Sequence, residues 1–184
     1  MNSTNNKGVT FIELLVAISV LAITASVAVP SFKNFIKDRR VEDTTIHIRE
    51  SLMLARSNAV KGDGGRLIPD ATDGWGQWVV QDSDNNIVFQ SQLAARIKVS
   101  VNKATVDADG NLTREAASIA NPDEIQFNAI GALRLKEGGT VSPLVGVVFD
   151  VCNEGDDSPG TQIVVSQLGW INTKTCLCSS EACP

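Results

Sequence analysis

The feature that most constrains this chain of 184 residues is an apolar run close to its N-terminus. The run extends over residues 9–29, and Glu13 is its only charged residue. Because an α-helix rises about 1.5 Å per residue, a helix over this run extends roughly 31 Å and can cross a hydrocarbon core of about 30 Å. The run therefore predicts one membrane-spanning helix.

The residues around the run indicate that it stays in the mature protein. A secretory signal peptide would end at the small residues of a cleavage site, but this run leads directly into Pro30 and a charged segment. Basic residues are more numerous after the run than before it, where Lys7 is the only one. That count alone would place the C-terminal side in the cytoplasm. The cysteines favour the opposite orientation, and we follow them.

All the cysteines lie late in the chain, at Cys152, Cys176, Cys178 and Cys183. Behind a membrane anchor, they indicate disulfides in an oxidising compartment. Zinc is disfavoured, because the C-x-C-x₄-C spacing lacks the paired C-x₂-C of structural zinc sites. Four cysteines allow three pairings. Because Cys176 and Cys178 are too close to pair easily, we favour Cys152–Cys176 together with Cys178–Cys183.

The next segment, residues 30–61, keeps a helical pattern beyond Pro30. Charged residues occupy one face, and Gly62 with Gly64 and Gly65 ends the pattern. We expect one continuous or kinked helix from about Val9 to Lys61, whose second half packs an apolar stripe on the rest of the chain. The stripe recurs at helical spacing, at Val41, Ile48, Leu52, Ala55 and Ala59.

Residues 62–184 have the pattern of short strands separated by turns. Segments 78–80 and 87–89 flank an acidic turn at 82–86 and predict a hairpin. Apolar and polar residues alternate at 97–101, 125–127 and 133–135, whereas segments 145–151 and 163–165 are apolar enough to be more fully buried. We therefore predict an α+β fold in which an antiparallel sheet covers the amphipathic half of the helix. Residues 107–122 are expected to form a long surface loop.

The head formed by residues 62–184 is acidic. It contains eight lysines and arginines against 16 aspartates and glutamates, a net charge of about −8. Nucleic-acid binding begins with a basic surface that releases counterions from phosphates. Nucleic acid is therefore not expected as a partner.

Motifs for catalysis or metal binding are missing from the sequence. It has no G-x-S-x-G, Walker or H-E-x-x-H motif, and its only histidine, His47, has no nucleophile beside it. The segments at 82–86 and 107–111 superficially resemble calcium loops but depart from the EF-hand pattern, so we interpret both as turns. We expect no enzymatic activity, no cofactor and no metal site.

The segment Lys7–Val16, KGVTFIELLV, resembles the class III signal of type IV prepilins and pseudopilins. In that family a prepilin peptidase cuts after the glycine and methylates the new amino terminus. The resemblance implies cleavage between Gly8 and Val9 and methylation of Val9, although the family usually has phenylalanine there. Glu13 matches the family's glutamate, and Pro30 matches a helix-kinking proline of many pilins.

Two interpretations of Glu13 follow. A carboxylate inside hydrocarbon is costly, so near the end of the segment it can extend to the membrane interface. It can instead pair with the Val9 amine of a neighbouring subunit during assembly. The resemblance implies the second role, which we favour.

Later segments resemble the GspH/FimT branch of the same family. DNA-binding members of that branch carry a basic Gly-Arg segment near the C-terminus, but here Trp170-Ile171-Asn172 follows the last motif without an arginine. This departure argues against DNA uptake. The matching segments are Ala55-Arg56-Ser57-Asn58-Ala59-Val60, Gly74-Trp75-Gly76-Gln77-Trp78-Val79-Val80, Phe127-x-x-x-Gly131 and Val164-Val165-Ser166-x-x-Gly169.

Together these observations predict a leader over residues 1–8, a transmembrane and assembly helix over 9–29, its amphipathic continuation over 30–61, and a periplasmic or extracellular head over 62–184. The resemblance implies that the chain is anchored in inner-membrane lipid before assembly and is cleaved by prepilin peptidase. It then joins other pilins through its N-terminal helix. We expect a minor pilin with a pilin fold that initiates or caps a type IV pilus. The alternatives are a type II secretion pseudopilin and, against the charge of the head, a DNA-uptake receptor.

Overall fold

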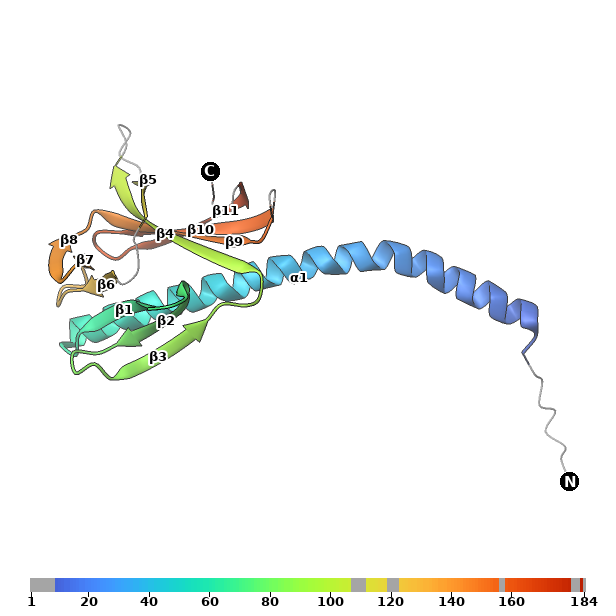
Figure 1. Ribbon diagram of the computed structural model, residues 1–184, viewed down its shortest axis with the longest axis horizontal. Helices are drawn as coiled ribbons and strands as arrows, with labels where there is room; N and C mark the ends of the chain where they lie inside the picture. The colour runs from blue at the N-terminus through green and yellow to red at the C-terminus, as the bar shows by residue number, and fades with distance from the viewer. Residues whose placement is uncertain (1–8, 107–111, 119–122, 156–157, 180–182, 184) are drawn as a thin grey trace, which may run out of the picture. The chain divides into compact units, whose positions relative to one another are not determined.

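A computed structural model describes residues 9–106, 112–118, 123–155, 158–179 and 183. The chain forms two compact units, residues 1–37 and 38–184. Helix α1 (Phe11–Lys61) contributes to both, and all the described strands belong to the second unit (Figure 1). The strands are β1 (Gly65–Asp70), β2 (Gly74–Gln81), β3 (Ile87–Gln92), β4 (Ile97–Val106), β5 (Leu112–Ser118), β6 (Glu124–Phe127), β7 (Leu133–Glu137), β8 (Thr140–Pro143), β9 (Gly146–Asn153), β10 (Ser158–Ser166) and β11 (Ile171–Cys178).

In the first unit, the described residues consist of Val9, Thr10 and the first part of α1. The apolar side chains of this part of the helix are exposed, with Leu21 exposed by 66% and Ile23 by 67%. Within the described residues, no helix combines the length and apolarity that a membrane crossing requires.

In the second unit, α1 buries the stripe that the sequence predicts. Val41, Ile48, Leu52, Ala55 and Ala59 are each at most 4% exposed. These values confirm the prediction. Residues at helical spacing share one face of a helix, and only that face of α1 packs against the sheets.

Helix α1 ends at Lys61, as its glycines predict. Gly62 adopts a left-handed φ of 93°. Its amide donates to the Ala59 carbonyl at 3.2 Å, and the Asp63 amide donates to the Asn58 carbonyl at 3.0 Å. These two bonds form a Schellman motif, which satisfies carbonyls that the helix end would leave without partners.

The strands form two antiparallel sheets. The first has the order β3-β2-β1-β6-β7-β8 and the second has the order β11-β10-β9-β4-β5. The α+β class is therefore confirmed, with two sheets in place of the single sheet expected. The predicted hairpin is also present, since Val80 of β2 pairs with Phe89 of β3.

One hydrophobic core joins α1 to both sheets. Trp75 of β2 meets Phe149 of β9 edge to face, with ring centroids 5.6 Å apart. Trp78 is 2% exposed, and its indole N–H donates to Ser51 Oγ of α1 at 2.8 Å. This hydrogen bond satisfies the polar atom that a buried tryptophan brings into a core.

Four strands differ from the sequence-based expectations. The stretch 107–122 was expected to be a loop, but its described part, Leu112–Ser118, is β5 and pairs with β4. Residues 107–111 and 119–122 lie outside the described residues. Strands β1, β8 and β11 were not predicted either. Strands β5, β8 and β11 each lie at a sheet edge, where polar side chains are common and the apolar pattern is weak, whereas β1 lies inside the first sheet.

Candidate functional site

The predicted processing site lies at the start of the described chain. Gly8 is outside the described residues, and Val9 is 77% exposed. Val9 and Thr10 precede α1, which begins at Phe11. Cleavage between Gly8 and Val9 and methylation of Val9 remain predictions.

Glu13 caps the start of its own helix. Its Oε2 accepts hydrogen bonds from the Thr10 amide and the Thr10 hydroxyl, both at 3.1 Å, and its own amide donates to Thr10 Oγ1 at 3.3 Å. Reciprocal bonds between residues three apart form a capping box. The T-x-x-E pattern was visible in the sequence but was missed there. In the single chain, the carboxylate therefore has a local structural role, and its predicted pairing with a second subunit is untested.

The side chains around Glu13 present a continuous apolar surface. Phe11 is 78% exposed, Ile12 65%, Leu14 57% and Val16 57%. A helix that is apolar on all sides suits hydrocarbon or the interior of a helix assembly. The geometry thus offers apolar contact to lipid or to other helices.

Pro30 lies inside α1. Proline in a helix interior removes one backbone hydrogen bond and favours a kink. Its side chain is outside the described set, so the helix kink remains a prediction.

In the second unit, Arg56 in the C-terminal part of α1 donates hydrogen bonds to two turns, which contain Gly131 and Gly169. Its Nη2 donates to the Leu168 carbonyl at 3.0 Å and its Nε donates to the Gly131 carbonyl at 3.3 Å. Gly131 and Gly169 have φ values of 76° and 77°. A Cβ on either glycine would come within 2.8 Å of Arg56 Nε. The arrangement brings together three segments that the sequence singled out separately.

Beside this contact, a hollow of about 630 Å³ separates the end of α1 from the segment leading into β11. Met53 lines it and is 50% exposed, and Trp170 lines it and is 74% exposed. Lys61 also lines it. The head thus presents an apolar surface of its own.

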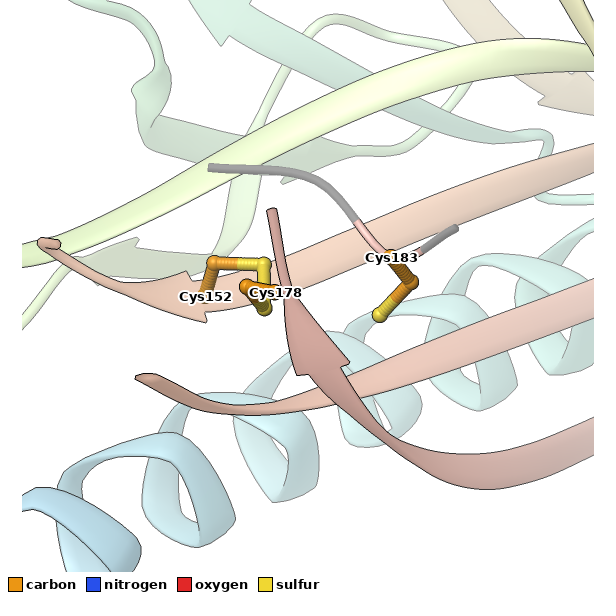
Figure 2. A group of neighbouring side chains, drawn as sticks. All are labelled: Cys152, Cys178 and Cys183. Atoms are coloured by element: carbon orange, nitrogen blue, oxygen red, sulfur yellow. A yellow bond between two sulfur atoms is a disulfide. The ribbon is translucent and has the colours of Figure 1, made fainter. Parts of the chain in front are cut away.

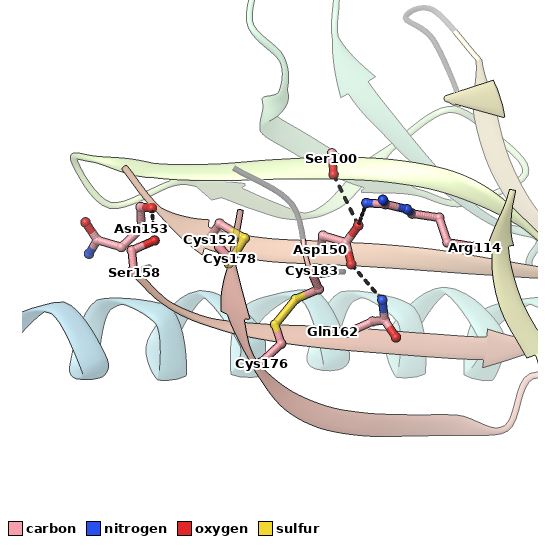
Figure 3. The surroundings of a disulfide bond; sticks show 10 residues. All are labelled: Ser100, Arg114, Asp150, Cys152, Asn153, Ser158, Gln162, Cys176, Cys178 and Cys183. Carbon is pink, nitrogen blue, oxygen red and sulfur yellow. Dashed lines mark hydrogen bonds and ion pairs between the residues drawn. A yellow bond between two sulfur atoms is a disulfide. The ribbon is translucent and has the colours of Figure 1, made fainter. Parts of the chain in front are cut away.

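The predicted disulfide pairing is wrong. The bonds join Cys152 to Cys178 and Cys176 to Cys183, with Cα–Cα distances of 6.0 and 5.8 Å (Figure 3). Strand β10 lies between β9 and β11, and its Gly160 is opposite both Cys152 and Cys176. Cys178, the last residue of β11, comes within 6.0 Å of Cys152 between Cα atoms, inside the separation that a disulfide tolerates. Sequence spacing could not reveal which cysteine of β11 comes close to Cys152.

Gly160 makes the observed bond possible. A Cβ built there would overlap Cys178 Sγ and would lie 3.3 Å from Cys152 Sγ. The bond therefore passes over a residue without a side chain, and it links β9 to β11 across β10.

A buried carboxylate, that of Asp150, lies on the same face of the second sheet as Cys152, two residues along β9. Asp150 is fully buried and accepts from Arg114 Nη1 at 2.9 Å, from Gln162 Nε2 at 3.0 Å and from Ser100 Oγ at 3.5 Å (Figure 3). Its partners come from β5, β10 and β4. Sequence reasoning missed this group, although an aspartate inside an apolar run was a usable signal. The buried carboxylate thus accepts from three donors, so we interpret the cluster as structural.

The acidic turn at 82–86 also folds locally. Asp82 Oδ1 accepts from the amides of Asp84 at 2.9 Å and Asn86 at 2.8 Å. The Asn86 side-chain amide donates to Asp82 Oδ2 at 3.0 Å. This hydrogen bond holds the pKa of Asp82 below its ordinary value. The segment is a hairpin turn, as predicted.

Comparison with known proteins identifies the N-terminal segment. A family model described as the prokaryotic N-terminal methylation motif matches residues 3–29. No curated protein and no solved structure matches the chain. The match covers Gly8, Val9 and Glu13 and extends to the end of the apolar run.

Proposed function

We propose that this chain, a type IV prepilin-like protein, is a minor pilin that initiates or caps assembly of a type IV pilus. The methylation motif over residues 3–29 is the observation that carries the proposal. Proteins of this type act as structural subunits of a pilus or pseudopilus. Four segments resemble the GspH/FimT branch, and three of them meet at Arg56. This resemblance favours a minor subunit.

Processing is the first step of the proposed pathway. A prepilin peptidase cuts between Gly8 and Val9 on the cytoplasmic face and methylates the Val9 amine. Val9 and Thr10 precede the helix, which suits a bond that a protease must reach. The leader of residues 1–8 is removed, and the apolar helix remains.

Before assembly, residues 9–29 hold the subunit in the inner membrane with the head in the periplasm. Their exposed apolar side chains support contact with lipid. The disulfides of the head support an oxidising location. During assembly, the helix leaves lipid for the interior of a filament, where other apolar helices replace the hydrocarbon.

Glu13 directs this transfer. An unpaired Glu13 carboxylate in hydrocarbon costs free energy. The Val9 amine of an incoming subunit carries the opposite charge and lies at the N-terminal end of that subunit's helix. The Thr10 cap occupies one oxygen of the carboxylate in the single chain. Pairing with the amine therefore adds to the cap or replaces it.

The test is incorporation of variants into sheared filaments. Glu13→Gln removes the charge and keeps a side chain that can form the capping box. An ion pair worth about 1.4 kcal/mol or more corresponds to an affinity change of about tenfold. We therefore expect membrane insertion to be unchanged and incorporation to fall by about tenfold.

Two matched variants separate pairing from capping. Thr10→Val removes the capping hydroxyl and keeps the charge, and Glu50→Gln removes an exposed charge from the part of α1 in the head. Both should be incorporated at close to the wild-type level. If Glu13→Gln is incorporated normally, or if Thr10→Val fails equally, the pairing role is wrong.

A type II secretion pseudopilin is the second candidate, because the same N-terminal motif serves pilus and pseudopilus. Deletion of the gene distinguishes them. Loss of surface pili with intact secretion supports the minor pilin, and the reverse supports the pseudopilin.

A DNA-uptake receptor is disfavoured by the net charge of about −8 on residues 62–184. The test is a gel-shift assay with the chain in detergent. Submicromolar, salt-sensitive DNA binding would overturn this electrostatic argument.

A further inference from the structure

We propose that the four cysteines form a thiol–disulfide exchange site. An external dithiol attacks the site at Cys176, and the released Cys183 thiolate then attacks the buried Cys152–Cys178 bond. The sulfur atoms of Cys152, Cys178 and Cys183 all lie within 4.8 Å of one another (Figure 2). Cys183 is bonded to Cys176, yet its sulfur also lies next to both sulfurs of the other bond. The two disulfides therefore behave as one chemical unit.

Burial sets the order of attack. Cys152 is 0% exposed, and Cys178 and Cys183 are each 1% exposed, whereas Cys176 is only half-buried. A thiolate must contact the sulfur that it attacks. An external dithiol therefore reaches Cys176 first, and the Cys152–Cys178 bond is shielded from direct attack.

The first step is an ordinary exchange reaction. A thiolate of the external dithiol attacks Cys176 Sγ and forms a mixed disulfide with it. The Cys176–Cys183 bond breaks, and its electron pair leaves on Cys183 as a thiolate. No net oxidation occurs in this step, since one disulfide replaces another.

The second step stays inside the head. The Cys183 thiolate attacks Cys178 Sγ or Cys152 Sγ, both within its reach. A new bond to Cys183 forms, the Cys152–Cys178 bond breaks, and the displaced cysteine becomes the thiolate. Because attacking and attacked sulfurs are held together, their effective concentration is high, on the order of millimolar or above.

The relay explains how the observed pairing can be reached. The native bonds interleave in sequence, since Cys176 lies between Cys152 and Cys178, and Cys178 lies between Cys176 and Cys183. Oxidation in order of emergence would join Cys152 to Cys176 first. The implied partner is a dithiol oxidoreductase with isomerase activity in the oxidising compartment.

The experiment compares two single variants of the full chain in detergent, produced in an oxidising compartment. Cys176→Ser leaves Cys183 as a free thiol beside the buried bond, and Cys183→Ser leaves Cys176 free. Each protein is held at about pH 8.5, where a typical thiol is half ionised. It is then quenched with acid and labelled with a maleimide under denaturing conditions, and peptide mass spectrometry locates the label.

We expect the label of Cys176→Ser to spread over Cys152, Cys178 and Cys183, and the label of Cys183→Ser to stay on Cys176. Label confined to Cys183 in the first variant, or an equal spread in both variants, overturns the proposal.

A second measurement covers the case in which Cys176→Ser does not fold. Under dilute dithiothreitol, the wild-type chain should lose the Cys152–Cys178 bond at least about tenfold faster than Cys183→Ser, because only the wild type can release a Cys183 thiolate beside that bond. Equal rates contradict the relay. Sulfur pairing is measured without filaments, so the result is independent of the pilus assignment.

Discussion

The two units of the molecule use apolar side chains in opposite ways. In the first unit, residues such as Phe11, Leu14 and Leu21 are more than half exposed. In the second unit, Ile48 and Leu52 of the same helix α1 are at most 2% exposed. The difference teaches that composition and helical pattern alone do not reveal the role of an apolar helix. What matters is whether the chain itself covers the apolar face.

Two carboxylates, Asp150 and Glu13, show the same contrast. Asp150 of the head has three partners from three other strands, so the fold of one chain satisfies it. Glu13 has only the local cap to Thr10 among its described hydrogen bonds. The head thus supplies the donors to its own buried carboxylate, whereas the pairing of Glu13 with a second subunit stays a proposal.

The sharpest test of this contrast is one leucine deletion in each unit. Leu52→Ala opens a cavity in the core and should lower the free energy of unfolding of the head by about 3 kcal/mol. For a chain of this size, this corresponds to a decrease in Tm of roughly 10 °C. Leu21→Ala should leave the head Tm unchanged. Both are measured by near-ultraviolet circular dichroism in detergent, and equal effects would break the distinction between the units.

A medium effect should come from the hydrogen bond between α1 and the first sheet. Ser51→Ala leaves the buried Trp78 N–H without its partner and should cost about 1–2 kcal/mol. Ser57→Ala, at an exposed position of the same helix, is the matched control and should change stability little. Chemical unfolding monitored by tryptophan fluorescence measures both. If Ser51→Ala is as stable as its control, then the hydrogen bond between Trp78 and Ser51 does not stabilise the packing of α1 on the first sheet.

The smallest effect concerns the turn at 82–86. The pKa of Asp82 is lowered by its hydrogen bonds, so the folded state is favoured while the carboxylate is charged. This contribution is complete above the ordinary value of 3.8 and is lost as the pH falls through the lower folded-state value. Asp82→Ala should therefore lower Tm slightly at pH 6, and its difference from wild type should shrink on acidification towards pH 2. Asp84→Ala is the control, and a difference independent of pH would contradict this origin.

Much of the architecture could be predicted from local patterns. The apolar stripe on α1, the glycine stop after Lys61 and the β2–β3 hairpin all depend on residues close in sequence, and the structure confirms each of them. The processing motif is likewise local, and the family match over residues 3–29 confirms the prepilin-like character.

The remaining features depend on which strands lie side by side. Two sheets replaced one. Strands β1, β5, β8 and β11 were missed, and the last three are edge strands that backbone pairing, rather than an apolar pattern, defines. The disulfide pairing failed for the same reason, since it depends on which cysteine of β11 comes close to Cys152 of β9. Val145 was expected inside a buried strand but is 47% exposed, because β9 begins one residue later.

The central claim is that a peptidase frees an amine at one fixed bond, and the intact mass of the mature chain tests it most directly. The account predicts a chain that begins at Val9 and carries one added methyl group. The mass should also be lower by four hydrogens, for the two disulfides. A mature protein that still contains residues 1–8, with an unmodified first residue, would contradict the account.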